Sequence, residues 1–188
     1  QKKNLKKNKI VWVSKINKIK QNPCIFIANE FFDSIAIKQF NKKEKIWFEK
    51  FVNLENKEKA FFFEKEIDIK KLEKKIGFKI SQNQNFIEYS ELGVNYLRNI
   101  AKIIKKNNGG ILLVDYGCFD KKMKNTLQGV SNHKFSNVLE NIGKTDITHN
   151  INFNFFKKII KQLGGLKDNL TTQRAFLINM GIKQRAEI

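Results

Sequence analysis

Two acidic residues stand where a short apolar run of the chain ends abruptly. The run Cys24–Ala28 leads into Asn29 and Glu30, and Asp33 follows three residues after Glu30. A buried strand that stops at polar and acidic side chains is how an open α/β sheet presents chemistry at its carboxyl edge. If a helical turn starts there, the spacing predicts that Glu30 and Asp33 share one face.

A second apolar strand, Ile111–Val114, also ends at an acid, Asp115. The segment before it has the signals of a helix, because Ser90 can cap the amino end and Glu91 lies at the positive end of the helix dipole. An apolar stripe at 3–4 spacing supports that helix: Leu97, Ile100, Ala101 and Ile104. A strand after a helical crossover is expected to lie parallel to its partner strand.

The remaining elements are predicted from shorter patterns. Residues Lys9–Val13 and Cys24–Asn29 are expected to form strands, with only irregular chain between them. A β-rich insertion is expected at about residues 37–67, in which Phe61–Phe63 is either a buried strand or the wall of a substrate groove. Three further helices are predicted. They are Asp68–Lys75, a helix that begins after the cap Asn152 and ends at Gly164-Gly165, and a last helix from Thr171 or Thr172 to Met180. Strands are predicted at Phe86–Tyr89 and Thr126–Val130, and irregular chain from His133 to Ile147.

Composition limits the classes of protein to consider. The 188 residues make one domain or part of one, and the formal charge of +19 invites a nucleic-acid partner. Only three of the 37 basic residues are arginine, whereas base-reading surfaces favour arginine, so we interpret the lysines as solvated faces and expect no specific nucleic-acid partner. Neither a zinc motif nor an apolar run of about 18 residues is present, so we expect no metal site and no membrane insertion. The two cysteines fit a reducing cytoplasm.

The glycine-rich turn that holds a nucleotide-type cofactor is missing from the sequence. No Gly-x-Gly occurs, and Gly109-Gly110 and Gly164-Gly165 follow predicted helices instead of opening them. Either the chain uses no such cofactor, or the half that carries the turn lies upstream of Gln1. Since the chain also lacks an initiator methionine, we expect it to be a fragment.

Five segments, in order, resemble signatures of the MidA-like methyltransferases, the family of a mitochondrial complex I assembly-factor arginine methyltransferase and its bacterial relatives. The first, Ile27–Phe40, is similar to the family's ANEFFDALPIRQF stretch, although Ser34-Ile35-Ala36 replaces the family's Ala-Leu-Pro. The others are Gly109–Gly117, Asn125–His133, Gly143–Phe153 and Thr172–Glu187. Many bacterial members read Ala-His where this chain reads His149-Asn150, so we assign no role to His149.

The resemblance implies an α/β fold of the class I methyltransferase type, a seven-stranded, mostly parallel, Rossmann-like sheet with S-adenosylmethionine across its carboxyl edge. It implies that residues 1–188 are the C-terminal part of that domain, with Lys9–Val13, Cys24–Asn29 and Ile111–Val114 as its third, fourth and fifth strands. The family's glycine-rich turn and ribose-binding acid would precede Trp12, so we expect this chain alone to be inactive.

The resemblance also assigns roles to residues. An arginine guanidinium as methyl acceptor needs carboxylates for bidentate hydrogen bonds, and Glu30 is the first choice for this role and Asp33 the second. Asp33 could instead only cap a following helix. Asn29 could orient the cofactor side of the site. Asp115, Tyr116 and His133 are candidates for binding the substrate, although Asp115 could equally be a structural acid at a strand end.

The function that the resemblance implies is S-adenosylmethionine-dependent methylation of a protein arginine in a bacterial cytoplasm, with a respiratory complex I subunit as the first candidate substrate. The rival from another class is a non-catalytic basic module that binds nucleic acid or a protein, in which the lysines matter and Glu30 does not.

Overall fold

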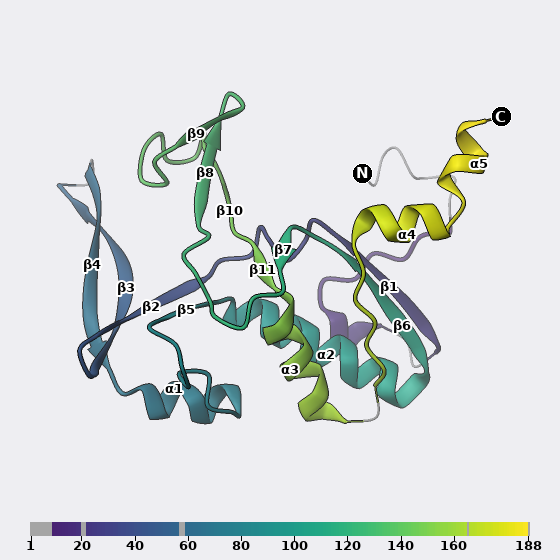
Figure 1. Ribbon diagram of the computed structural model, residues 1–188, viewed down its shortest axis with the longest axis horizontal. Helices are drawn as coiled ribbons and strands as arrows, with labels where there is room; N and C mark the ends of the chain where they lie inside the picture. The colour runs from purple at the N-terminus through teal and green to yellow at the C-terminus, as the bar shows by residue number, and fades with distance from the viewer. Residues whose placement is uncertain (1–8, 20–21, 57–58, 165, 188) are drawn as a thin grey trace.

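Two short parallel strands form the frame of the fold. The computed structural model describes residues 9–19, 22–56, 59–164 and 166–187. Strand β1 (Cys24–Asn29) pairs in parallel with β6 (Gly109–Val114), in a register that sets Asn29 beside Val114. Helix α2 (Glu91–Asn107) precedes β6 and packs against both strands (Figure 1). The predicted parallel strand after a helix is therefore confirmed, with β1 as its partner.

The turn from α2 into β6 depends on Gly109. Its φ is +126°, and a Cβ built on it would lie 1.9 Å from the carbonyl oxygen of Cys24. Any side chain would therefore collide with the neighbouring strand, so a glycine is needed where α2 ends and β6 begins.

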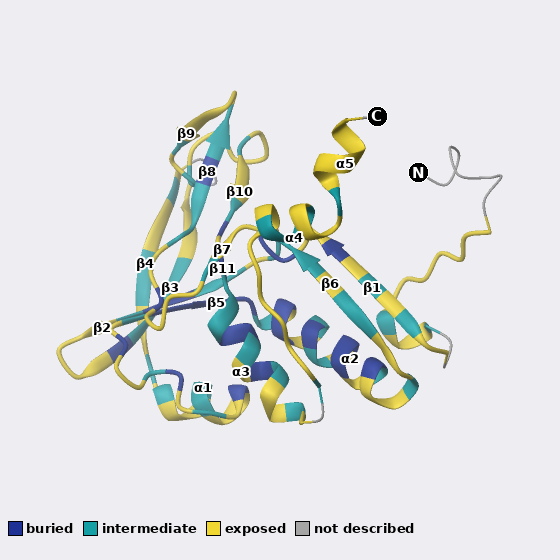
Figure 2. Cartoon of the chain, turned by 45° about the vertical axis from the view of Figure 1, so that its right-hand side comes forward, coloured by how far each residue is buried: buried dark blue, intermediate teal, exposed yellow. Residues whose placement is uncertain are grey.

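Helices α2 and α3 begin at the predicted caps. The Ser90 hydroxyl accepts a hydrogen bond from the Gly93 N–H at 2.9 Å, and Asn152 accepts from the Phe155 N–H at 2.9 Å at the start of α3 (Phe153–Leu163). The helices lie side by side, and the Lys105 ammonium donates to the Leu163 carbonyl at 2.9 Å. Buried residues recur along both helices (Figure 2), and on α2 they include the predicted apolar stripe.

A four-stranded antiparallel sheet in the order β4-β3-β2-β5 follows the parallel frame. Its strands are β2 (Lys38–Lys43), β3 (Ile46–Glu55), β4 (Lys59–Ile67) and β5 (Phe86–Tyr89). Helix α1 (Ile69–Ile76) joins β4 to the segment before β5, and Asp68 caps it by accepting from the Lys70 N–H at 2.9 Å. The β-type runs expected within residues 37–67 are thus present as strands.

The end of the β3–β4 hairpin differs from the prediction. Phe61 and Phe62 lie in a strand, as expected, but each is 38% exposed instead of buried. The cause is that β4 is an edge strand and the hairpin projects from the body (Figure 1). A lysine side chain partly covers the Phe62 ring, because the Lys50 ammonium lies 4.9 Å from its centre.

Smaller elements complete the described chain. The segment expected to be irregular contributes β9 (Lys134–Ser136) and β10 (Asp146–Thr148), which join β8 (Gln128–Ser131) in a three-stranded arm. Thr172 caps α4 (Gln173–Asn179) as predicted, but after Gly181 the chain forms a further helix, α5 (Ile182–Ala186). The last two pieces are the short parallel pair β7 (Gly117–Cys118) with β11 (Ile151–Asn152), and the 3-10 turn η1 (Ile16–Lys18).

The predicted strand at Lys9–Val13 is wrong for this structure, which assigns no strand there. A strand exists only where a neighbouring strand completes its hydrogen bonds, and within the described ranges β1 pairs with β6 alone. Val11, an apolar residue of this segment, is 83% exposed in this structure and does not pack into the core.

The core joins the antiparallel sheet to the two long helices. Aromatic rings connect the sheet to α3. The Phe40 ring of β2 stacks on Tyr89 of β5, and Tyr89 packs edge-on against Phe155 of α3. Phe32 packs in the same way against Phe156 of α3. Among the residues that the structure describes, no helix is long and apolar enough to cross a bilayer.

Candidate active site at the carboxyl ends of β1 and β6

Glu30 and Asp115 come to the same edge of the parallel pair because their strands end side by side. Asn29 pairs with Val114, and the Glu30 N–H donates to the Val114 carbonyl at 2.8 Å. Glu30 has a φ of +44°, which is uncommon for a residue with a side chain, and its side chain is exposed. Unfavourable backbone conformations of this kind concentrate at functional sites. This edge is therefore the candidate active site.

Glu30 and Asp33 do not share a helical face. After Glu30 the chain makes one turn, closed by the Ile35 N–H donating to the Phe32 carbonyl at 3.3 Å, and no helix follows. Asp33 is only 7% exposed, whereas Glu30 faces solvent. The two expectations of a shared face and of Asp33 as a helix cap are therefore wrong, because the chain leaves the turn directly as β2.

Aromatic packing fixes this turn to the helices beneath it. The Phe31 ring meets Tyr96 of α2 at 5.5 Å between centroids, and the Phe32 ring meets Phe156 of α3 at 5.1 Å. Phe32 is 1% exposed. The two adjacent phenylalanines thus anchor the turn between Glu30 and Asp33 to α2 and α3.

Asp115 holds the turn through its carboxylate. Its Oδ2 accepts from the N–H groups of Phe32 at 2.9 Å and Asp33 at 3.3 Å, and its Oδ1 accepts from the Tyr116 N–H at 2.9 Å. Burial and then the nearby Asp33 charge raise the pKa of Asp115, and the three amide hydrogen bonds oppose that shift. With both oxygens occupied, these contacts favour the structural interpretation of Asp115.

A residue without an assigned role, His149, lies next to Asp33. The backbone N–H of His149 donates to the backbone carbonyl of Asp33 at 3.1 Å, and His149 is 6% exposed. Its Nδ1 lies 3.4 Å from the Asn150 carbonyl. One signal in the sequence could have drawn attention to it, because it is one of only two histidines. Its burial against Asp33 depends on the path of residues 148–151 and cannot be read from spacing.

A second buried carboxylate, Glu88 of β5, anchors the segment that leads to His149. Glu88 accepts from the Gln39 side-chain amide at 2.6 Å and from the Thr126 hydroxyl. Thr126 Oγ1 in turn accepts from the Asn150 N–H at 2.9 Å. The sequence pattern of Phe86–Tyr89 predicts only a strand, because nothing in it shows that Glu88 points inward.

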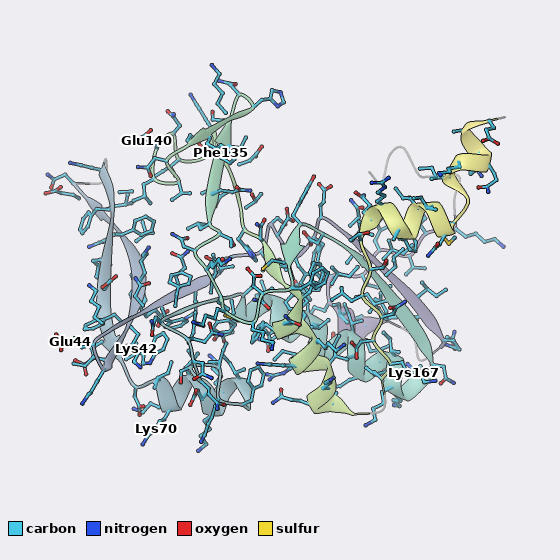
Figure 3. All side chains as sticks on the ribbon, viewed as in Figure 1. Lys42, Glu44, Lys70, Phe135, Glu140 and Lys167 are labelled. Atoms are coloured by element: carbon cyan, nitrogen blue, oxygen red, sulfur yellow. The ribbon has the colours of Figure 1, made fainter. Side chains whose placement is uncertain are left out.

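The other candidate residues lie in different surroundings. Asn29 is exposed at the last position of β1, and Tyr116 is 62% exposed beside Asp115. His133 is exposed in the turn between β8 and β9, on the arm that carries Phe135 and Glu140 in Figure 3. Within the described part of the chain, no hydrogen bond or ion pair joins His133 to the edge. Asn29, Glu30, Asp33, Asp115 and Tyr116 thus come together, and His133 lies apart.

The next question is whether the residues that the structure describes could hold a metal ion or a cofactor. No group of three or more histidine, cysteine, aspartate or glutamate side chains is placed there to hold a metal ion. Asn29 and Glu30 offer an exposed amide and carboxylate at the strand edge, which suits the polar and cationic groups of S-adenosylmethionine. The sequence has no glycine-rich turn to complete that site.

Comparisons with known proteins identify relatives over nearly the whole chain. Residues 1–170 match the model of a family described as "Putative S-adenosyl-L-methionine-dependent methyltransferase". The zebrafish (Danio rerio) protein arginine methyltransferase NDUFAF7, mitochondrial, is 31% identical over 184 residues, covering 95% of this chain and 42% of its own length. The Caenorhabditis elegans homolog is 29% identical over 178 residues, covering 94% of this chain and 42% of its length. The chain thus spans about two fifths of the length of the curated relatives it matches.

A solved structure shows the same fold. A Burkholderia thailandensis protein bound to S-adenosyl-homocysteine superposes with a TM-score of 0.74 at 18% identity, over 95% of this chain and 47% of that one. The class I methyltransferase fold expected from the sequence is therefore confirmed. With the family model matching most of its residues, this chain belongs to the S-adenosyl-L-methionine-dependent methyltransferase family.

Proposed function

We propose that this chain forms the methyl-acceptor side of an S-adenosylmethionine-dependent protein arginine methyltransferase. The observation that carries the proposal is Glu30, an exposed carboxylate in an unfavourable backbone conformation at the carboxyl end of a parallel strand. The names of the relatives, protein arginine methyltransferases at 24–31% identity, support arginine as the acceptor.

Exposed apolar residues on β1 support the view that other parts of the natural protein complete the site. Ile25 and Ile27 are 79% and 74% exposed, although parallel sheets are normally covered on both faces. The relatives are more than twice as long as the region they share with this chain. We therefore propose that a glycine-rich turn outside residues 1–188 binds the cofactor together with Asn29.

Bound S-adenosylmethionine would supply an electrophilic methyl group on a positively charged sulfur. Glu30 would accept hydrogen bonds from two N–H groups of the guanidinium and hold a third nitrogen toward that methyl group. Because the acceptor and the sulfonium are both cationic, carboxylates at this edge would offset their repulsion. Asp115 would keep Glu30 in place through the amide groups of the turn, without touching the substrate.

The substrate is proposed to be a protein, and a respiratory complex I subunit is the first candidate because of the family resemblance. A bacterial cytoplasm is the proposed location, and the two free cysteines, Cys24 and Cys118, agree with a reducing compartment.

The test is methyl transfer by the complete natural protein to a peptide from the candidate subunit. We expect mass spectrometry to find methylation on arginine, and no transfer to the same peptide with each arginine replaced by lysine. Equal transfer to both peptides would contradict an arginine acceptor, and transfer to neither would contradict the proposed substrate.

A further inference from the structure

Two buried side-chain atoms at the candidate site have no hydrogen-bond partner among the described residues. They are Oδ1 of Asp33 and Nε2 of His149, and both residues are more than nine-tenths buried. The hydrogen bond from the His149 N–H to the Asp33 carbonyl holds the two residues on adjacent segments. Buried polar atoms are rarely left unpaired in folded proteins, so this pair calls for a ligand or a partner.

Both atoms can act as acceptors. The His149 Nδ1 lies 3.4 Å from the Asn150 carbonyl, which can only accept, so this contact fits the tautomer with the proton on Nδ1, in which Nε2 presents a lone pair. The Asp33 carboxylate oxygen is an acceptor as well. The Asp115 carboxylate cannot serve either of them, because its oxygens are acceptors themselves and accept three backbone N–H groups. A group that satisfies this pair must therefore bring at least two N–H or O–H donors.

We propose that His149 Nε2 and Asp33 Oδ1 form a receptor for the guanidinium of the substrate arginine. This inference rests on the proposed function. A guanidinium fits because it is planar, always charged and carries five N–H donors, so it can satisfy both acceptors and leave other donors for Glu30. The carboxylates of Asp33 and Asp115 also make the position favourable for a cation. Both acceptor atoms are shielded from solvent, so the guanidinium reaches them through a local opening of the edge.

The ¹⁵N NMR resonances of the histidine rings test this directly in the complete natural protein, with His149 assigned through His149→Gln. Methylguanidinium chloride is the probe, and tetramethylammonium chloride, a cation without N–H donors, is the control. We expect methylguanidinium to move the His149 Nε2 resonance saturably, tetramethylammonium to leave it unmoved, and the exposed His133 to respond to neither. Asp33→Asn should weaken the methylguanidinium response about tenfold, as expected for loss of a charge-assisted hydrogen bond.

The outcomes separate this inference from the proposed function. An unmoved His149 resonance in an enzyme that still methylates arginine would overturn the receptor and leave the function standing. A saturable shift in a protein that methylates no arginine peptide would support a guanidinium receptor while the proposed function fails. If S-adenosylmethionine alone moves the resonance and methylguanidinium does not, the pair binds the cofactor's ammonium group and the proposal is wrong. The wild-type titration needs no variant, so a misfolded Asp33→Asn would not obscure the result.

Discussion

At the scale of single residues, the two acids of the turn after β1 differ in burial. Glu30 faces solvent and Asp33 is buried, although they are three residues apart. Both acids can be selected from the sequence, because a strand that ends at acids is visible as a pattern. The sequence does not show which acid is buried, since the turn ends in β2 instead of a helix and the burial of Asp33 comes from distant segments. For the same reason the sequence pattern assigns no role to His149.

The titration of Asp115 gives a prediction at this scale. Its pKa is raised in the folded protein above the ordinary 3.8, so the folded state binds the proton more tightly than the unfolded state. The stability that this contributes is complete below pH 3.8 and is lost as the pH rises through the folded pKa. The quantity to compare is the free energy of unfolding of wild type minus that of Asp115→Asn. We expect this difference to be largest in acid and to fall as the pH rises through the folded pKa of Asp115. Urea unfolding of both proteins at a series of pH values measures it, and a difference that grows with pH would contradict the assigned cause.

At the scale of elements, the helix caps are what the sequence predicts best. Ser90, Asn152 and Thr172 each accept from a backbone N–H three residues on, because the capping pattern depends only on local geometry. The predictions that fail concern strands, which form only beside another strand that can lie far away in the sequence. The structure assigns no strand at Lys9–Val13, and the strands β9 and β10 exist only because β8 lies between them.

The cap of α2 should matter more than the cap of α4. The Ser90 hydroxyl accepts from the Gly93 N–H and also donates to the Ala36 carbonyl at 2.8 Å, so it joins the helix to the segment that follows the Glu30 turn. We expect Ser90→Ala to lower the free energy of unfolding by about 1–3 kcal/mol, since a cap and a second buried hydrogen bond are lost together. Thr172→Ala is the control, because Thr172 is exposed and, within the part of the chain that the structure describes, its hydroxyl makes the capping bond alone. Denaturant unfolding of the two variants compares them, and equal losses would contradict a tertiary role for Ser90.

At the scale of the whole molecule, the charge of +19 is spread over many elements. Lys42 near the β2–β3 turn, Lys70 on α1 and Lys167 after α3 are all exposed, and Figure 3 shows Lys42 and Lys70 toward one end of the molecule and Lys167 toward the other. Lysines also serve local ion pairs, such as Lys75 with Glu91 at 2.6 Å. The fold class and the family could be recognised from the sequence because five motifs occur in order, whereas the projecting arms and their exposed apolar residues could not.

This charge distribution predicts weak and unselective nucleic-acid binding. We expect RNA and DNA oligonucleotides of unrelated sequence to bind alike, with affinity falling steeply as salt rises, because the attraction comes from counterion release and not from base contacts. Fluorescence anisotropy at low and physiological salt measures it. Tight, sequence-selective binding that survives physiological salt would favour a basic binding module over the enzyme.

The central claim, that Glu30 holds the methyl acceptor, is tested most directly by single-turnover methyl transfer in the complete natural protein carrying Glu30→Gln. The change keeps the shape and removes a charge-assisted hydrogen bond worth about 1.5–3 kcal/mol, so transfer should slow by roughly ten- to a hundredfold with cofactor affinity unchanged. Glu44→Gln is a matched control, because Glu44 is also exposed with a positive φ, +53°, but lies in the β2–β3 turn. The account predicts a slow Glu30→Gln beside a normal Glu44→Gln, with similar melting temperatures. Wild-type rates in Glu30→Gln, or equal losses in both variants, would contradict it.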